Sequence, residues 1–546
     1  MYLMYISGPD LANQIYEELS AVGIGPEQYL GGAYDGQYFH CNVPQILDEK
    51  FGFTGDSCKH SDWDPLHRAG TEDKHMRQDP NFLWLVQVTD VCTLAFKTIN
   101  FGAEFEHFYE VCDRLKNDDS FTAAVYSGLP CFFSATRFAN HCAKVFQTLR
   151  KDYPGLLVTL AETQEKNCTG DSKQREKAAN AAEIKNKLMN KKFVLQLSGV
   201  VDIYTVFGHG VNVLQTLNML PHDKYDRFNQ VCVNKLKSML NTISSHKKCP
   251  KNDKGNTICD WPCFHSDSES LTKTLEYRGI IIIDDFQKLV NTRENARNNL
   301  QDELKGVLPL VISQLTGMAK HLHTSLSTQI FKADDLVHLK NIRTVLNVGP
   351  LAQRVKARGV PTIAAIDTKP FIQSAKKLAS NLRDVPDAEL KIQFRTFLTR
   401  LTDASKDIDC TNLAMSNIKL IQIFLDTKKE LYVGIELIMH ALSVACVSMS
   451  IESIIESQIS TYEALFPKNR TPSEKRGKQE MVIKLNGPNL AHSTPLLKQS
   501  LDKYFGEKKK SKWHFTKAER HIDSYNISRV LERNLNEKSK LPFMDA

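Results

Sequence analysis

The stretch Gly31-Gly32-Ala33-Tyr34-Asp35-Gly36 reads as a short strand that ends in a carboxylate. Far along the chain, Ser450-Ile451-Glu452-Ser453-Ile454-Ile455-Glu456 reads as an acid-bearing helix. Carboxylates that meet in space from distant segments suit a metal-dependent phosphoryl-transfer site, because the cations neutralise the scissile phosphate and activate the attacking hydroxyl. Asp35 and Glu452 are therefore candidate metal ligands and catalytic residues, with Glu456 as the alternative to Glu452.

These acids also have plain structural explanations. An Asp followed by Gly at a strand end is typical of a turn, because both residues tolerate unusual backbone angles. Glu452 and Glu456 are four residues apart, so they can form the solvated edge of an amphipathic helix. Taken singly, Asp35 and the two glutamates favour these explanations over catalysis.

A second group of polar residues precedes Pro65. On a strand, alternation places His60, Asp62 and Asp64 on one face, and His67 follows closely. These four side chains could form the metal site of an unrelated hydrolase or a hydrogen-bonded polar edge. The polar edge is favoured, because Pro65 breaks the strand immediately afterwards.

Length and composition describe an ordinary globular chain. Its 546 residues exceed one core, so two or three domains are expected. Hydrophobic residues make up 42% and charged residues 24%, and the net charge of +7 is compatible with a nucleic-acid partner without demanding one. Thirteen scattered cysteines favour a reducing compartment over a disulfide scaffold. With no apolar run near the roughly 20 residues of a membrane span, we expect no membrane partner.

The first hundred residues follow an α/β pattern and the later ones a helical pattern. We expect a strand at Tyr2–Ile6, a helix at Leu11–Val22 that is capped by Asp10, a strand at Leu30–Tyr34 and a helix at Val43–Phe51. From about Phe82 the periodicity is helical for several hundred residues.

Taken together and in this order, several motifs resemble those of hAT-family DNA transposases. The family's second acid lies in a pattern that Gly32-Ala33-Tyr34-Asp35-Gly36 resembles, and its Cys-or-Asp-x-x-His motif matches Asp64-Pro65-Leu66-His67. Arg137-Phe138 is similar to the family's Arg-Trp pair, and Glu452 to the glutamate of its Ser-x-x-Glu-Arg signature.

The resemblance implies a fold and a division of the chain. The fold is an α/β ribonuclease H-like mixed sheet, interrupted by a large helical insertion, so that the protein is predominantly helical. Residues 1–80 would be the N-terminal part of the core, 81–430 the insertion, 431–500 the closing helices with the third acid, and 501–546 a basic tail.

The resemblance also assigns roles. In an active enzyme, Asp35 and Glu452 would hold Mg²⁺ or Mn²⁺. The residues that the resemblance places against DNA are Asp64, His67, Arg137 and Phe138. The composition of the tail, with Lys508, Lys509, Lys510 and Lys512 next to aromatic residues, adds a further expected DNA contact; nuclear import or a solvated chain end would explain it equally. The implied location is the nucleus, and homo-oligomers are expected.

Departures from the family pattern argue against cleavage. If Tyr2–Ile6 is the third strand of the fold, the first two strands and the first catalytic acid are absent. Ser453 replaces the signature arginine, and Phe138 replaces the tryptophan. We expect a transposon-derived nuclear protein that binds DNA or protein without cleaving DNA; the alternatives are an active transposase with an upstream exon and the unrelated hydrolase.

Three cysteines and a histidine could form a further metal site. Cys249, Cys259, Cys263 and His265 supply four ligand types that zinc accepts. Their spacing lacks a Cys-x2-Cys knuckle, so the sequence leaves zinc binding open.

Overall fold

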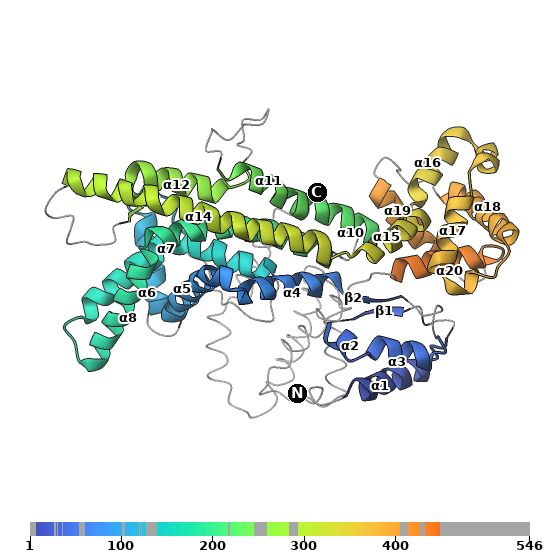
Figure 1. Cartoon of the computed structure of the whole chain (residues 1–546), viewed down its shortest axis with the longest axis horizontal. Helices are drawn as coiled ribbons and strands as arrows, with labels where there is room; N and C mark the ends of the chain where they lie inside the picture. Colours follow the sequence, from blue (N-terminus) through green and yellow to red (C-terminus); the bar gives the residue numbers. More distant parts are fainter. Residues whose placement is uncertain are drawn as a thin grey trace, which may run out of the picture. The chain divides into compact units, whose positions relative to one another are not determined.

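The computed structural model describes residues 7–26, 29, 31–34, 36–53, 60–100, 104–119, 121, 123–126, 139–216, 219–244, 259–282, 293–404, 413–425 and 432–447. The chain divides into two compact units, Met1–Ser453 and Ile454–Ala546, and all of the described residues belong to the first. The described part is predominantly helical (Figure 1). This confirms the helical class that the periodicity predicted.

The N-terminal part contains a pair of parallel strands. Its elements are α1 (Gly8–Ala21), β1 (Gly31–Tyr34), α2 (Gly36–His40), α3 (Val43–Lys50) and β2 (His60–Trp63). The two strands pair from Gly31 opposite His60 to Tyr34 opposite Trp63, and Figure 1 shows them side by side. Parallel pairing needs a crossover connection, which α2 and α3 supply here.

A small core holds the N-terminal helices together. Ala12 of α1 and Val43 and Leu47 of α3 are buried there, with Tyr29 and Phe51 stacked at 4.4 Å between ring centroids. Offset-stacked aromatic rings stabilise such a core beyond the area they bury. The apolar positions that predicted helix Val43–Phe51 are thus those that pack against α1.

The start of α1 differs from the prediction. Ser7, and not Asp10, is the N-cap: its hydroxyl accepts a hydrogen bond from the backbone N–H of Asp10 at 3.3 Å. Pro9 stands in the first turn, where a proline costs no hydrogen bond. The helix therefore begins one turn earlier than predicted, and the expected strand Tyr2–Ile6 lies outside the described residues.

Helices form the remainder of the described unit. They are α4 (Pro65–Gln78), η3 (Pro80–Phe82), α5 (Leu83–Asn100), α6 (Glu104–Lys116), α7 (Ala139–Asn167), α8 (Ser172–Leu188), α9 (Lys191–Gln215), α10 (Pro221–Phe228), the π-helical η4 (Asn229–Val233), α11 (Asn234–Thr242), α12 (Pro262–Thr274), α14 (Arg293–Gln329), α15 (Ala333–Leu346), α16 (Val348–Arg358), η5 (Val360–Ala365), α17 (Lys369–Leu378), η6 (Ser380–Leu382), α18 (Asp387–Ala404), α19 (Leu413–Leu425) and α20 (Glu436–Val447). A short antiparallel ribbon, β3 (Glu276–Tyr277) and β4 (Ile280–Ile281), follows α12.

Helix α9 is the centre of the large core. It packs against α7, α12 and α14, and most of its residues are buried on every side. A helix that is apolar nearly all round must be enclosed by neighbours. The same continuous cluster of buried side chains extends from α4 to α20.

Two described helices are long and apolar enough to cross a membrane. They are the segment Pro80–Ile99, in which 44% of the most apolar window is buried, and Lys191–Gln215, in which 89% is buried. The second is α9, whose hydropathy is explained by its place in the core. Helices of this kind are weak evidence for a membrane protein.

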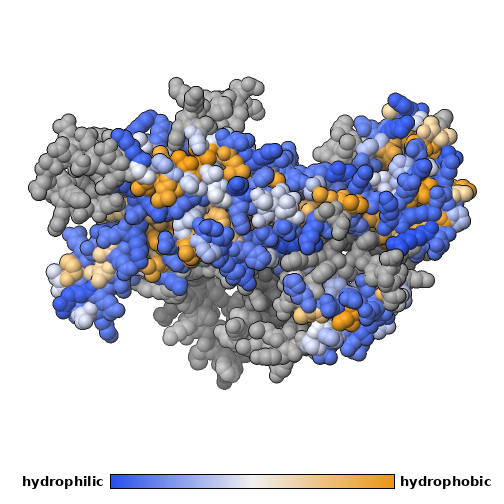
Figure 2. All heavy atoms as spheres, viewed as in Figure 1, coloured by the Kyte–Doolittle hydropathy of each residue, from blue (hydrophilic) through white to orange (hydrophobic). Residues whose placement is uncertain are grey.

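The exposed surface is mainly polar. On the face drawn in Figure 2, hydrophilic residues cover most of the described surface, with smaller hydrophobic areas between them. Exposed large apolar side chains, such as Val337 and Ile392, belong to different helices. Isolated apolar residues are normal on the surface of a globular protein.

Candidate functional site at the strand ends

The carboxyl ends of β1 and β2 bring two of the predicted motifs together. The backbone N–H of Asp64 donates to the carbonyl of Tyr34 at 3.0 Å, so the pairing continues one residue beyond β2. Asp35 follows Tyr34 directly in the sequence but lies outside the described residues. The chain therefore leaves β1 towards Asp35 next to the point where the Asp64-x-x-His67 motif begins.

Asp64 has a structural role as the N-cap of α4. Its Oδ1 accepts a hydrogen bond from the backbone N–H of Leu66 at 2.7 Å, and the residue is fully buried. Strand β2 ends at Trp63, as predicted from Pro65, and Pro65 occupies the first turn of a helix that was not predicted. His67 lies in this first turn too, where its carbonyl accepts from Thr71.

Buried ion pairs and hydrogen bonds hold α4 in place. Near its start, Arg68 donates to the carbonyl of Ile330 at 3.1 Å and to the carboxylate of Asp335 at 2.5 Å. Ile330 lies in the segment that joins α14 to α15, and Asp335 lies in the first turn of α15. The position of the Asp64-x-x-His67 turn is therefore set by distant helices of the same unit.

A second anchor lies further along α4. Tyr204 of α9 donates its hydroxyl to Asp73 at 2.5 Å and accepts from Arg77 at 2.8 Å. Arg77 also donates to Asp73 at 3.2 Å, which closes a ring of three contacts. Charge-assisted hydrogen bonds of this kind are stronger than neutral ones, so they fix α4 against the central helix.

Lys224 of α10 adds a positive charge near Asp64. The lysine is 8% exposed, and its burial lowers its pKa to about 8 although the charge of Asp64 acts in the opposite direction. Removing an ammonium group from water is unfavourable without a close partner. Lys224 therefore interacts electrostatically with Asp64, the residue that caps α4.

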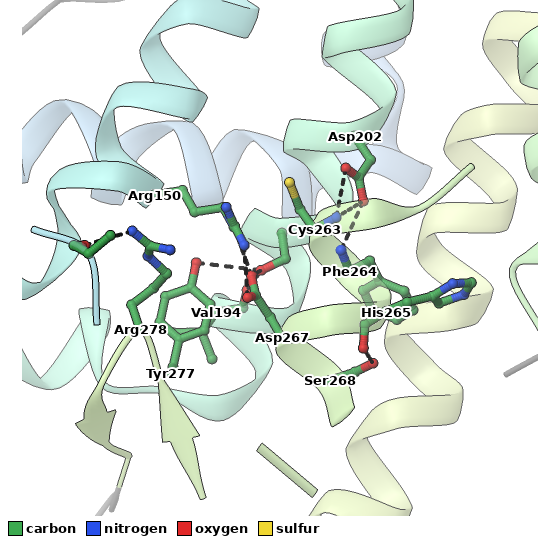
Figure 3. A network of polar contacts seen from close by, with 12 residues as sticks. Arg150, Val194, Asp202, Cys263, Phe264, His265, Asp267, Ser268, Tyr277 and Arg278 are labelled. Carbon is green, nitrogen blue, oxygen red and sulfur yellow. Dashed lines mark hydrogen bonds and ion pairs between the residues drawn. The ribbon is translucent and has the colours of Figure 1, made fainter. Parts of the chain in front are cut away.

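A separate polar network lies inside the helical core (Figure 3). Arg150 of α7 forms a bidentate ion pair with Asp267 of α12, both bonds being 2.8 Å long. The hydroxyl of Ser198 also donates to Asp267, at 2.6 Å. Because the carboxylate of Asp267 is matched by these donors, the network joins α7, α9 and α12 structurally.

Asp202 belongs to the same region and caps α12. Its carboxylate accepts from the backbone N–H groups of Cys263, at 3.1 Å, and Phe264, at 2.9 Å, as Figure 3 shows. Burial raises its pKa to about 7, and these hydrogen bonds offset part of that rise. The side chain thus replaces the hydrogen bonds that the first N–H groups of a helix lack.

Of the four residues at which zinc binding was left open, Cys259, Cys263 and His265 are described. Cys259 and His265 lie in contact, with 3.2 Å between Sγ and Nδ1, and the backbone of Cys263 is bound to Asp202. Cys249 lies outside the described residues. Across the described ranges, no group of three or more His, Cys, Asp or Glu side chains is placed to hold a metal ion.

The other predicted site residues cannot be placed. Those outside the described residues are Asp35, Arg137, Phe138, Glu452, Glu456, Lys508, Lys509, Lys510 and Lys512. Strand β2 includes His60 and Asp62, but their side chains are not described, so the convergence required by a hydrolase site stays untested. The meeting of Asp35 with Glu452 likewise remains a prediction.

Neither Lys224 nor Asp202 was predicted from the sequence. Lys224 follows the helix-starting Pro221, and nothing in that local pattern indicates a partner near Asp64. Asp202 stands among the buried apolar residues of α9. An acid in such a helix needs a hydrogen-bond partner, and this was the one feature of the sequence that could have indicated its role.

Comparisons of the chain with protein-family models, with curated proteins and with solved structures gave no match.

Proposed function

We propose that this chain is a hAT-transposase-like nuclear protein with a ribonuclease H-like core, which binds DNA and does not cleave it. The main support is the parallel strand pair, in which Asp35 follows the first strand and Asp64-x-x-His67 follows the second. Side chains at adjacent parallel strand ends share one edge, where ligands of α/β proteins commonly bind. The order of these two motifs along the chain is the order that the family resemblance implies.

Charge supports the choice of DNA as partner. Residues 348–404 contain ten Lys or Arg against five Asp or Glu, an excess of five in a chain whose total is +7. Such clustering favours a polyanion, because neutralised phosphates release their counterions.

The inactive form is favoured by two substitutions in the motifs themselves. Ser453 stands where the family signature has an arginine, and Phe138 where it has a tryptophan. A phenylalanine can stack on a flipped base but lacks the indole hydrogen-bond donor. An active transposase would use Mg²⁺ or Mn²⁺ at Asp35 and Glu452. The alternative of an unrelated metal-dependent hydrolase has less support, because one of its four expected ligands, Asp64, already caps α4.

DNA binding and cleavage can be measured separately. Purified protein is titrated into fluorescein-labelled duplex DNA, and incubated with supercoiled plasmid in Mg²⁺ or Mn²⁺. We expect duplex binding that weakens steeply with salt, and no nicking above that of the Asp35→Asn variant. Nicking that Asp35→Asn abolishes would establish the active transposase instead, and failure to bind duplex at low salt would refute DNA as the partner.

The nuclear location and self-association are part of the same proposal. The cluster Lys508-Lys509-Lys510-Ser511-Lys512 has the composition of a nuclear import signal. Replacing its four lysines by glutamine in a fluorescent fusion should move the protein to the cytoplasm. Sedimentation of the purified chain should give a mass above the 61.9 kDa of the monomer.

A further inference from the structure

A cysteine and a histidine lie in contact where α11 and α12 meet. Sγ of Cys259 is 3.2 Å from Nδ1 of His265, which stands near the start of α12. The other ring nitrogen, Nε2, lies 3.4 Å from the carbonyl oxygen of Ile243, the residue that follows α11. Because a carbonyl oxygen only accepts, Nε2 carries the proton of the neutral ring, and Nδ1 is the nitrogen that can accept the proton of the thiol.

Hydrogen bonds hold the segment that contains Cys259 against α11. The indole Nε1 of Trp261 donates to the carbonyl of Met239 at 2.8 Å, and Trp261 is fully buried. The backbone N–H of His265 donates in turn to the carbonyl of Trp261 at 2.9 Å. These bonds position the thiol and the imidazole before any reagent arrives, which is the arrangement that an activated nucleophile needs.

The negative charge next to Cys259 is compensated. Asp260 follows Cys259 in the chain, and its carboxylate forms an ion pair with Lys235 and accepts from the hydroxyl of Ser238 at 2.6 Å. A carboxylate that is paired in this way opposes the formation of a neighbouring thiolate less than an unpaired carboxylate would.

Cys263 has the opposite surroundings, although it lies only four residues further along the chain. Both cysteines are half-buried, but burial raises the pKa of the Cys263 thiol and the charge of Asp202 acts in the same direction. Figure 3 shows the side chain of His265 pointing away from Cys263 and Asp202. The thiol of Cys263 therefore stays protonated, so the two cysteines differ in their partners and not in their exposure.

We propose that Cys259 is a redox-sensitive nucleophile, with His265 as its base, and that hydrogen peroxide converts it to a sulfenic acid. Nδ1 of His265 takes the thiol proton, and the thiolate sulfur attacks one oxygen of the peroxide. The S–O bond forms as the O–O bond breaks, so the sulfur loses two electrons and the peroxide gains them. The leaving hydroxide takes the proton back from Nδ1 and departs as water. This inference does not rest on the proposed DNA binding.

The test compares cysteines within one sample of the full chain. Limiting hydrogen peroxide is added together with dimedone, which traps sulfenic acids, and mass spectrometry of the peptides gives the labelling rate at each cysteine. Cys168 is the control for exposure, because it is exposed and its thiol donates to the carbonyl of Glu165 at 3.1 Å instead of to an imidazole. We expect Cys259 to be labelled about tenfold or more faster than Cys168, although it is less exposed, and Cys263 to stay unlabelled.

Two histidine variants test the role of the base. His265→Gln should slow the labelling of Cys259 by about tenfold or more and leave the rate at Cys168 unchanged. His209→Gln, which replaces an exposed histidine of α9, should change neither rate. Circular dichroism checks that both variants are folded.

Either of two results overturns the inference. The first is labelling of Cys168 in the wild type at least as fast as that of Cys259, a comparison that needs no variant and so holds even if His265→Gln does not fold. The second is labelling of Cys259 at the wild-type rate in folded His265→Gln.

Discussion

Asp202 illustrates how burial changes a single residue. The residue is 4% exposed, and the pKa of its carboxyl group is raised to about 7 because burial disfavours the charged form. Between the ordinary Asp value and this pKa, the folded chain holds a proton that the unfolded chain has lost. The contribution of this residue to stability is therefore complete at low pH and falls as the pH rises towards 7.

The Asp202→Asn variant should remove this dependence. Each unit of pKa difference corresponds to about 1.4 kcal/mol, so the free energy of unfolding of the wild type should fall relative to the variant by roughly that amount per pH unit between about pH 4 and 7. Urea unfolding of the wild type and the variant at several pH values measures this difference in the free energy of unfolding.

A carboxyl group with the opposite shift provides the control for Asp202. Hydrogen bonds from Lys235, Ser238 and Thr242 lower the pKa of Asp260 despite its partial burial. The folded state then binds the proton less readily than the unfolded state, so Asp260→Asn should remove stability that grows with pH. Parallel pH profiles for the wild type and Asp202→Asn would contradict the role given to Asp202.

At the scale of an element, α4 connects the strand pair to the helical core. Its first turn carries Asp64 and His67, and Arg68 in the same turn reaches Asp335 and Ile330. The side chains of Arg68 and Asp335 are 9% and 15% exposed. Removing one member of a buried pair leaves the other charge without compensation, which is more damaging than removing both.

Arg68→Ala should therefore lower the free energy of unfolding by about 3–5 kcal/mol. Arg68→Met combined with Asp335→Asn should recover most of that loss, because it removes both charges and keeps an acceptor for the backbone N–H of Lys332. A double-mutant cycle by urea unfolding measures the coupling.

The exposed pair Arg343 and Asp226 is the control for this anchor. Their side chains are 46% and 56% exposed, so Arg343→Ala should change stability by less than about 1 kcal/mol. If Arg68→Ala is as mild as this control, the Arg68 pair does not anchor α4.

At the scale of the whole described unit, close packing around α9 limits which substitutions the core tolerates. A Cβ added at Gly199 of α9 would lie 2.1 Å from a methyl carbon of Leu315 of α14. Gly306 stands within α14 on the exposed side, where an added Cβ meets nothing within 4 Å. The same substitution thus meets opposite conditions at the two positions.

Gly199→Ala should destabilise the unit by about 1–3 kcal/mol through overpacking. Gly306→Ala should stabilise it by up to about 1 kcal/mol, because alanine favours the helix over glycine. Thermal unfolding monitored by circular dichroism measures the direction in which each variant shifts the melting temperature. Two shifts of the same sign would show that the contact with Leu315 does not govern the outcome.

Local sequence determined much of the secondary structure. Helix Val43–Phe51 was predicted to within one residue, and β1 ends at Tyr34 as the glycine-flanked pattern indicated. Both predictions succeeded because apolar spacing and turn residues act over only a few residues of the chain. The wrong prediction of the start of α1 has a local cause too. Ser7 and Asp10 are both good N-cap residues, and Pro9 favours the earlier start. The ordered motifs also led from sequence alone to the transposase proposal.

Only the tertiary structure decided which polar groups became partners. Arg68 meets Asp335, and Arg150 meets Asp267, across sequence separations of 267 and 117 residues. Lys224 comes near Asp64 in the same way. Local patterns specify the geometry of the backbone, whereas the partners of a buried charge depend on how helices pack, and many packings satisfy the same apolar pattern.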